Sequence, residues 1–66
     1  MFSYAPLWKT LINLDISKPD FKKMCNIYNA TYTSLNKNEY VSMATIDNIC
    51  NVLNCDIQDV VEHRRK

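Results

Sequence analysis

The stretch that decides the fold is residues 17–38, "SKPDFKKMCNIYNATYTSLNKN", which holds a short helix, a turn and the helix that follows it. Ser17 and Asp20 form a pair that resembles a capping box, with Asp in place of the usual Glu or Gln. Pro19 is tolerated only in the first turn of a helix. This stretch therefore predicts a helix over residues 18–25, directly after the cap.

The second part of the stretch, "CNIYNATYTSLNKN" (residues 25–38), is crowded with Asn, Thr, Ser and Tyr and carries a single charged residue. After one polar turn it predicts a helix over about residues 28–37, in which Tyr32 and Leu35 can share a face. Because Thr and Asn are weak helix formers, this helix must depend on packing against its neighbours. The helix pair and its turn cover about residues 18–37.

The rest of the chain predicts three further helices, over residues 5–14, 43–53 and 57–61. Their apolar stripes are, in order, Leu7, Trp8, Leu11 and Ile12; Ile46, Ile49, Cys50 and Leu53; and Ile57, Val60 and Val61. The predicted fold class is therefore all-α, with five helices. The two ends, "MFSY" and "VVEHRRK", are the remaining extended segments, and they could pair as short strands.

The chain has no glycine, although helix ends often need a residue that tolerates a positive φ angle. Asparagine is the usual substitute. Three asparagines stand where helices are expected to end: Asn26, Asn38 and Asn54. The expected N-terminal caps of the last two helices are Ser42, and Asp56 with Asp59.

Size and composition indicate one small globular domain over residues 1–66, with 47% hydrophobic residues. No apolar run approaches the ~20 residues that a membrane-spanning helix needs. The first residues lack the basic and apolar regions of a secretory signal. We therefore expect a cytoplasmic protein that has no membrane partner.

The residue types that carry catalysis or bind metals are sparse. Cys25, Cys50 and Cys55 form no Cys-x-x-Cys pair, and His63 is the single histidine. This spacing does not suit a zinc site, so the cysteines are expected to be reduced and to pack as small hydrophobic residues. No Ser/His/Asp, Cys/His or phosphate-loop pattern is present. We expect no enzymatic activity, cofactor, metal ion or small-molecule effector site.

The net charge is only +1, but the charges are segregated along the chain. Residues 16–38 hold four lysines against one acid, a sum of +3, whereas residues 39–62 hold five acids and no Lys or Arg, a sum of −5. The last four residues, "HRRK", return to +3 with neutral His. The folded domain should therefore have a basic surface and an acidic surface.

Two short helices joined by one tight turn form a helix-turn-helix, in which the second helix enters the DNA major groove. This arrangement explains the polar, uncharged stretch, because base edges are read by short donors and acceptors. The side chain of Asn29 can bond adenine at two positions, and a Thr methyl can contact thymine. Neighbouring lysines would hold phosphates and set the register. The predicted partner is double-stranded DNA.

At this point the chain resembles the Cro and phage-repressor type of helix-turn-helix regulators, often called the Xre family, and in particular its small stand-alone members. The resemblance covers nearly the whole chain and is carried by "LWKTLI", "SKPDFKK" and, most specifically, "VSMATIDNICNVLNCDIQDVVE". It implies a lambda-repressor-like bundle of five α-helices from a bacterium or phage. It also implies a transcriptional regulator that binds operator DNA, commonly as a homodimer on a palindrome.

The resemblance also implies roles for individual positions. Base-facing positions correspond to Tyr28, Asn29, Ala30 and Ser34, with Thr31 and Thr33 beside them. Backbone-contacting positions correspond to Lys18 and Lys37, and the nearby Lys22 and Lys23 are further candidates for phosphate contact. Lys22 stands where relatives often have a small residue, so its stem must pack while its ammonium group reaches solvent. Tyr40 could lean on the sugar-phosphate backbone or pack within its loop.

Two hypotheses follow. In the first, the protein is a sequence-specific regulator that places the third helix in the major groove of a palindromic operator. In the second, it is a protein-interaction module, similar to an antitoxin or inhibitor, that docks through the acidic fourth and fifth helices. The segment from His63 to Lys66 could be a solvated tail, a clamp on the DNA backbone or a strand at a dimer interface.

Overall fold

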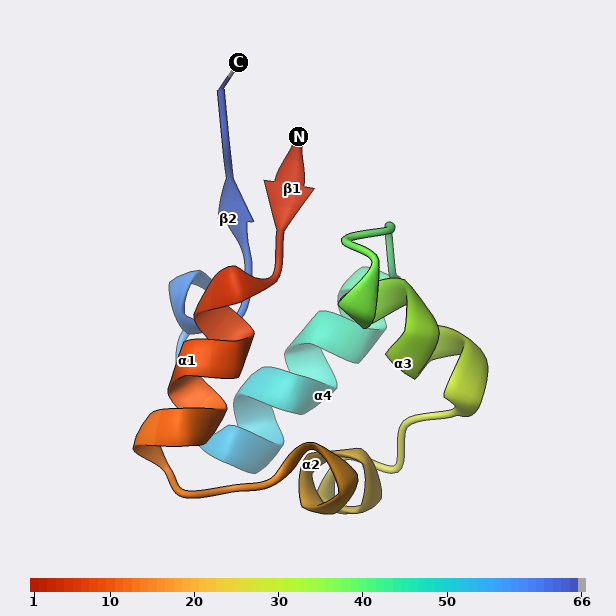
Figure 1. Cartoon of the computed structure of the whole chain (residues 1–66), viewed down its shortest axis with the longest axis vertical. Helices are drawn as coiled ribbons and strands as arrows, with labels where there is room; N and C mark the ends of the chain where they lie inside the picture. The colour runs from red at the N-terminus through yellow and green to blue at the C-terminus, as the bar shows by residue number, and fades with distance from the viewer. Residues whose placement is uncertain (66) are drawn as a thin grey trace.

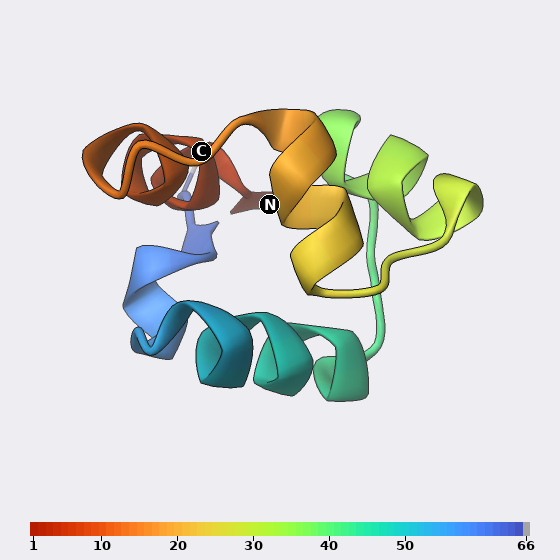
Figure 2. The same cartoon turned by 90° about the horizontal axis from the view of Figure 1, so that it is seen from below.

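The computed structural model describes residues 1–65, which form four α-helices, one turn of 3₁₀ helix and a two-stranded sheet. In chain order the elements are β1 (Phe2–Ser3), α1 (Ala5–Asn13), α2 (Lys18–Met24), α3 (Asn29–Asn36), α4 (Met43–Leu53), η1 (Ile57–Asp59) and β2 (Glu62–His63). Figure 1 shows α4 running behind the other helices. Seen from below, α1, α2 and α3 lie on one side of the core, and α4 and η1 on the other (Figure 2). No helix in the described part of the chain is long and apolar enough to cross a membrane.

The predicted helices α1 to α4 are confirmed, but the predicted fifth α-helix over residues 57–61 is wrong. The structure has a single 3₁₀ turn, Ile57–Asp59, in its place. This turn is closed by the carboxylate of Asp59, which accepts a hydrogen bond from the backbone N–H of Asp56 at 3.1 Å. The helix cannot continue, because the chain must extend at Glu62 in order to pair with β1. The fold is therefore mostly helical rather than purely α.

The pairing of the two ends as short strands is confirmed. β1 and β2 are antiparallel, with Phe2 opposite His63 and Ser3 opposite Glu62. This sheet brings the first and last parts of the described chain side by side (Figure 1). The final lysine of the C-terminal segment, Lys66, lies outside the described residues.

The expected helix ends are also found. The Ser17 hydroxyl accepts a hydrogen bond from the Asp20 N–H, and the Ser42 hydroxyl accepts one from the Thr45 N–H, both at 3.2 Å. The predicted asparagines all adopt positive φ angles, with Asn26 at 53°, Asn38 at 56° and Asn54 at 52°. Asp15, at 57°, does the same at the end of α1 and was not predicted. At these helix ends, Asn and Asp therefore adopt the left-handed backbone conformation that glycine usually provides.

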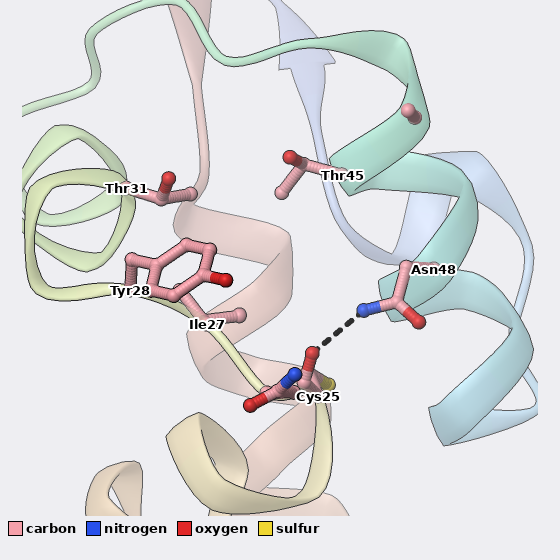
Figure 3. A pocket seen from close by; sticks show the side chains of 8 residues that line it. Cys25, Ile27, Tyr28, Thr31, Thr45 and Asn48 are labelled. Atoms are coloured by element: carbon pink, nitrogen blue, oxygen red, sulfur yellow. Dashed lines mark hydrogen bonds between the residues drawn. The ribbon is translucent and has the colours of Figure 1, made fainter.

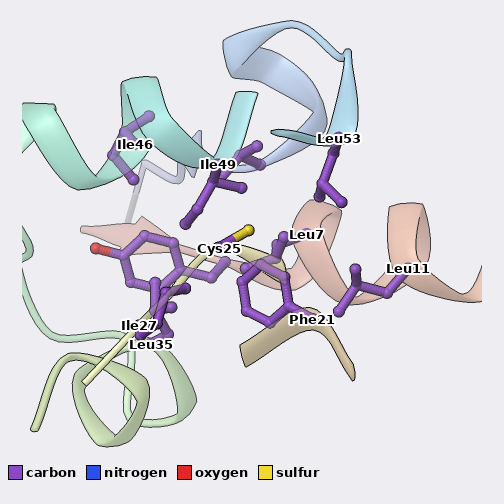
Figure 4. Packing of buried hydrophobic residues seen from close by; sticks show 11 residues of the cluster. Leu7, Leu11, Phe21, Cys25, Ile27, Leu35, Ile46, Ile49 and Leu53 are labelled. Atoms are coloured by element: carbon purple, nitrogen blue, oxygen red, sulfur yellow. The ribbon is translucent and has the colours of Figure 1, made fainter. Parts of the chain in front are cut away.

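The core lies between the two layers of helices and contains side chains from each of the four α-helices (Figure 4). The largest fully buried side chains are Leu7, Phe21, Leu35, Ile49 and Val60. Full burial of one such side chain contributes about 1.5–3 kcal/mol relative to exposure. In a chain of this size, these few residues must supply much of the folding free energy.

The stripe predicted for α1 is too wide. Leu7 and Leu11, one turn apart, are buried, and Trp8 packs at the edge of the core, but Ile12 is 76% exposed. The hydroxyl of Thr10 donates a hydrogen bond of 2.7 Å to the carbonyl of Asp59, which packs η1 against the side of α1 that carries Thr10, far around the helix from Ile12. The side chain of Ile12 is left facing solvent.

The cysteines are free thiols, as expected, and Cys25 is buried in the core. Burial, together with the proximity of Cys55, raises the pKa of the Cys25 thiol from its ordinary value of 9.0 to about 11. The pKa values of Cys50 and Cys55 are raised as well, mainly by burial. Because the thiolate is the reactive form, all three side chains are suited to packing rather than to nucleophilic chemistry.

The left-handed backbone at Asn54 yields a test of the asparagine argument. Asn54→Ala should lower the free energy of unfolding by about 1 kcal/mol, because a Cβ in this conformation is strained without a polar side chain to offset it. Asn54→Gly should leave stability unchanged or raise it. Urea denaturation of the three proteins measures the difference, and a glycine variant less stable than the alanine variant would contradict the argument.

Candidate nucleic-acid interface

The turn between α2 and α3 is fixed by its own backbone and by α4. The N–H of Asn26 donates to the carbonyl of Lys23 at 3.2 Å, and the N–H of Ile27 donates to the carbonyl of Lys22 at 3.0 Å. The Ile27 side chain is buried in the core. The turn therefore sets the position of α3 relative to α2 through both hydrogen bonds and burial.

A side chain of α4 holds the same turn from the opposite side. The amide Nδ2 of Asn48 donates a hydrogen bond of 2.7 Å to the backbone carbonyl of Cys25. Figure 3 shows this bond reaching across the hollow between the turn and α4. Asn48 was not predicted as a site residue, because its only local signal is a polar side chain beside the apolar stripe of α4.

Helix α3 has one face in the core and one in solvent. Leu35 is fully buried, and Tyr32 is partly buried and packs against the core. On the opposite side, Asn29, Thr33 and Asn36 are all exposed, at the spacing i, i+4 and i+7 that forms one line along a helix. The structure thus anchors α3 by its inner face and leaves a polar line on its outer face, which we call the α3 outer face.

The six predicted base-contacting residues fall into two groups. Four of them are exposed: Tyr28, Asn29, Ala30 and Thr33. Thr31 and Ser34 are half-buried and line a hollow shared with the loop that precedes α4 and the first turn of that helix. The Ser34 hydroxyl donates a hydrogen bond of 3.2 Å to the carbonyl of Ala30. This second group therefore serves the contact between α3 and its neighbours as well as facing outward.

Lys22 joins α2 to the front of α3. Its ammonium group donates a hydrogen bond to Oδ1 of Asn29 and lies 5.5 Å from the centre of the Tyr32 ring. The side chain is half-buried, so its stem packs while its charge stays at the surface, as expected for a lysine in this position. Because Oδ1 is held by Lys22, the amide of Asn29 has a defined orientation at the surface.

Lys18 makes a second bridge between the two helices. Its ammonium group donates a hydrogen bond of 3.1 Å to Oδ1 of Asn36 and lies 4.3 Å from the centre of the Trp8 ring. The amide of Asn36 in turn donates to the carbonyl of Tyr32 at 2.9 Å. Asn36 was not predicted as a site residue, although its position seven residues after Asn29 places it on the same outer face.

The remaining predicted phosphate contacts are exposed residues that precede or follow α3 in the chain. Lys23 and Lys37 are exposed, at the last turn of α2 and directly after α3. Tyr40 is 80% exposed, and its ring packs edge-on against Phe2 with the ring centres 5.5 Å apart. Tyr40 therefore has a packing contact within the chain and also remains open to solvent.

The loop over residues 37–42 is fixed by the N-terminal part of the chain. The N–H of Tyr4 donates to Oδ1 of Asn38 at 2.9 Å, and the hydroxyl of Tyr4 donates to the carbonyl of Glu39 at 2.8 Å. Tyr4 itself is buried. The loop that follows α3 is thus held by a buried side chain 35 residues away in sequence from Glu39.

Two short helices joined by a fixed turn, with lysines beside the exposed face of the second helix, define a helix-turn-helix DNA-binding domain. The chain belongs to the family described as the Cro/C1-type helix-turn-helix DNA-binding domain, whose family model matches residues 6–66. This confirms the resemblance noted in the sequence. No curated protein sequence matches the chain significantly.

One solved structure is closely similar to this chain. The crystal structure of the transcriptional regulator VanUg superposes with a TM-score of 0.94 at 37% sequence identity. The alignment covers 98% of this chain and 87% of that one. The family and this likeness together support a DNA-binding regulator.

The Asn48 hydrogen bond leads to a prediction for the stability of the turn. Asn48→Ala should lower the free energy of unfolding by about 1–2 kcal/mol, because the Cys25 carbonyl loses its partner in a partly buried position. Asn51→Ala, on the same helix, removes only a 3.4 Å contact with Asp47 and should change stability by less than about 0.5 kcal/mol. Chemical denaturation compares the two variants, and equal effects would show that the bond does not hold the turn.

Proposed function

We propose that this protein is a sequence-specific transcriptional regulator that places α3 in the major groove of a palindromic operator and binds as a homodimer. The observation that carries this proposal is the α3 outer face, which presents amides and a hydroxyl in one line between lysines of α2 and Lys37. Its family membership supports a DNA-binding role. The protein acts by binding rather than by catalysis.

The base contacts that we propose follow from the chemistry of the exposed residues. Asn29 presents an amide that can bond adenine at N6 and N7, and Lys22 already fixes its orientation. Tyr28, Ala30 and Thr33 lie beside it and offer apolar atoms for a thymine methyl. Thr31 and Ser34 make the remaining base contacts through the part of each half-buried side chain that stays accessible to solvent.

The proposed backbone contacts surround this face. Lys18, Lys22, Lys23 and Lys37 hold phosphates, and the hydroxyl of Tyr40 donates to one. Each neutralised phosphate releases condensed counterions, so affinity falls with salt by a log–log slope of about 0.9 per contact. One copy with so few lysines binds weakly, and two copies on a palindrome double both the phosphate contacts and the base contacts.

The first experiment is the selection of bound sequences from a random duplex pool at near-physiological salt. The wild-type protein should enrich a palindromic motif. Asn29→Ala should lose or relax the preference at one position of each half-site and weaken binding to the best sequence by about 1–3 kcal/mol. Asn13→Ala, which removes an exposed amide on α1, serves as the matched control and should leave the motif unchanged.

Two results would count against this proposal. If the folded protein enriches no sequence, the regulator hypothesis is wrong, and binding of a protein partner to the acidic surface becomes the better hypothesis. If a motif is enriched but Asn29→Ala leaves it intact, DNA is bound by a surface other than the α3 outer face.

The lysines are predicted to contribute affinity rather than sequence preference. Lys37→Ala should weaken binding to all sequences alike and lower the salt slope by about 1 per bound copy. Lys22→Ala should do the same and also relax the position read by Asn29, because the amide loses the partner that orients it. Titrations at several salt concentrations, on the selected site and on an unrelated duplex, separate the two effects. An unchanged slope for Lys37→Ala would remove that residue from the interface.

A further inference from the structure

A group of exposed apolar side chains lies together at the end of the molecule that carries the sheet. Phe2 is 40% exposed, Met43 67% and Ile57 47%, and they line one hollow together with Tyr40 and Val61. Single exposed apolar residues are common on protein surfaces, whereas a contiguous group marks a surface that is covered by a partner. We call this group the sheet-end patch. Figure 1 shows β1, the loop over residues 37–42 and the start of α4 meeting at this end.

The patch continues past Met43 and Ile57 into a second hollow, which Asp47 and Asp56 also line. The carboxylates of Asp47, Asp56 and Asp59 are close enough to raise the pKa of Cys50, after the larger effect of burial. The opposite end of the patch is formed by β1 and β2, where the His63 ring packs edge-on against Phe2. There Arg64 pairs with Glu62 at 2.9 Å, and Arg65 leaves this end with a net positive charge. One end of the patch is therefore acidic and the other basic.

We propose that the sheet-end patch is the surface through which a second copy of this chain binds, with a two-fold axis passing close to Met43 and Ile57. A two-fold rotation about such an axis lays the acidic end of one copy over the basic end of the other. The patch is thus complementary to itself, which is what a two-fold interface requires. The apolar middle is buried, and the opposite charges meet at its two ends.

The role of this dimer in binding a palindrome rests on the proposed function. The patch reaches α3 at Tyr40, which lines the sheet-end hollow and also the hollow beside Thr31 and Ser34. For the proposed regulator, a dimer joined here must present its two α3 helices to half-sites one helical turn apart, about 34 Å.

The test is sedimentation equilibrium of the full chain without DNA, over a wide concentration range. The wild type should show a reversible monomer–dimer equilibrium. Met43→Glu should weaken dimerisation at least tenfold, because it places a carboxylate beside its own symmetry mate. The fold should survive, since residue 43 opens α4, where an acidic side chain is favoured. Ile12→Glu is the matched control, because Ile12 is equally apolar, 76% exposed and lines a different hollow, and it should leave dimerisation unchanged.

A second measurement separates this inference from the proposed function. Met43→Glu should bind a single half-site as the wild type does but lose the gain in affinity that the full palindrome provides. A wild type that stays monomeric, alone and on the palindrome, would overturn the dimer surface while leaving the regulator reading intact. Equal effects of Met43→Glu and Ile12→Glu would overturn it too. If Met43→Glu alone loses dimerisation but the wild-type protein selects no DNA sequence, the sheet-end patch is supported as the dimer surface and the regulator hypothesis is rejected.

Discussion

The hydrogen bond from Asn48 to the carbonyl of Cys25, together with the burial of Ile27 beside it, is the constraint on which the rest of the site depends. It ties the turn between α2 and α3 to α4, the helix that forms the other side of the core. Without a fixed turn, α3 would have too little helical propensity to stay folded. The bridges from Lys22 to Asn29 and from Lys18 to Asn36 can form only after the turn has set the angle between the two helices.

The absence of glycine shapes this fold in a consistent way. In the described part of the chain, four residues have a left-handed backbone, and all of them are Asn or Asp: Asp15, Asn26, Asn38 and Asn54. Asn38, for example, adopts a positive φ angle and also accepts a hydrogen bond from the N–H of Tyr4. A glycine could satisfy the first requirement but could not fix the loop to the N-terminal part of the chain.

Much of the fold could be predicted from the sequence, because its strongest signals are local. Caps such as Ser17 and Ser42, the ends at asparagine and the stripe of α4 depend on neighbouring residues only. The errors have non-local causes. The exposure of Ile12 depends on where η1 packs, and the shortness of η1 depends on β2 pairing with a strand at the other end of the chain. The roles of Asn48 and Asn36 depend on contacts across 23 and 18 residues, which periodicity does not encode.

The two faces of α3 separate the residues that hold the helix from those that it displays. Leu35 and Tyr32 attach it to the core, whereas Asn29 and Thr33 point to solvent and contribute little to packing. Exchanges at the outer positions should therefore cost little folding free energy, while the same exchanges would alter what the helix can recognise. A scaffold of this kind can diverge in specificity during evolution without first acquiring compensating mutations in its core.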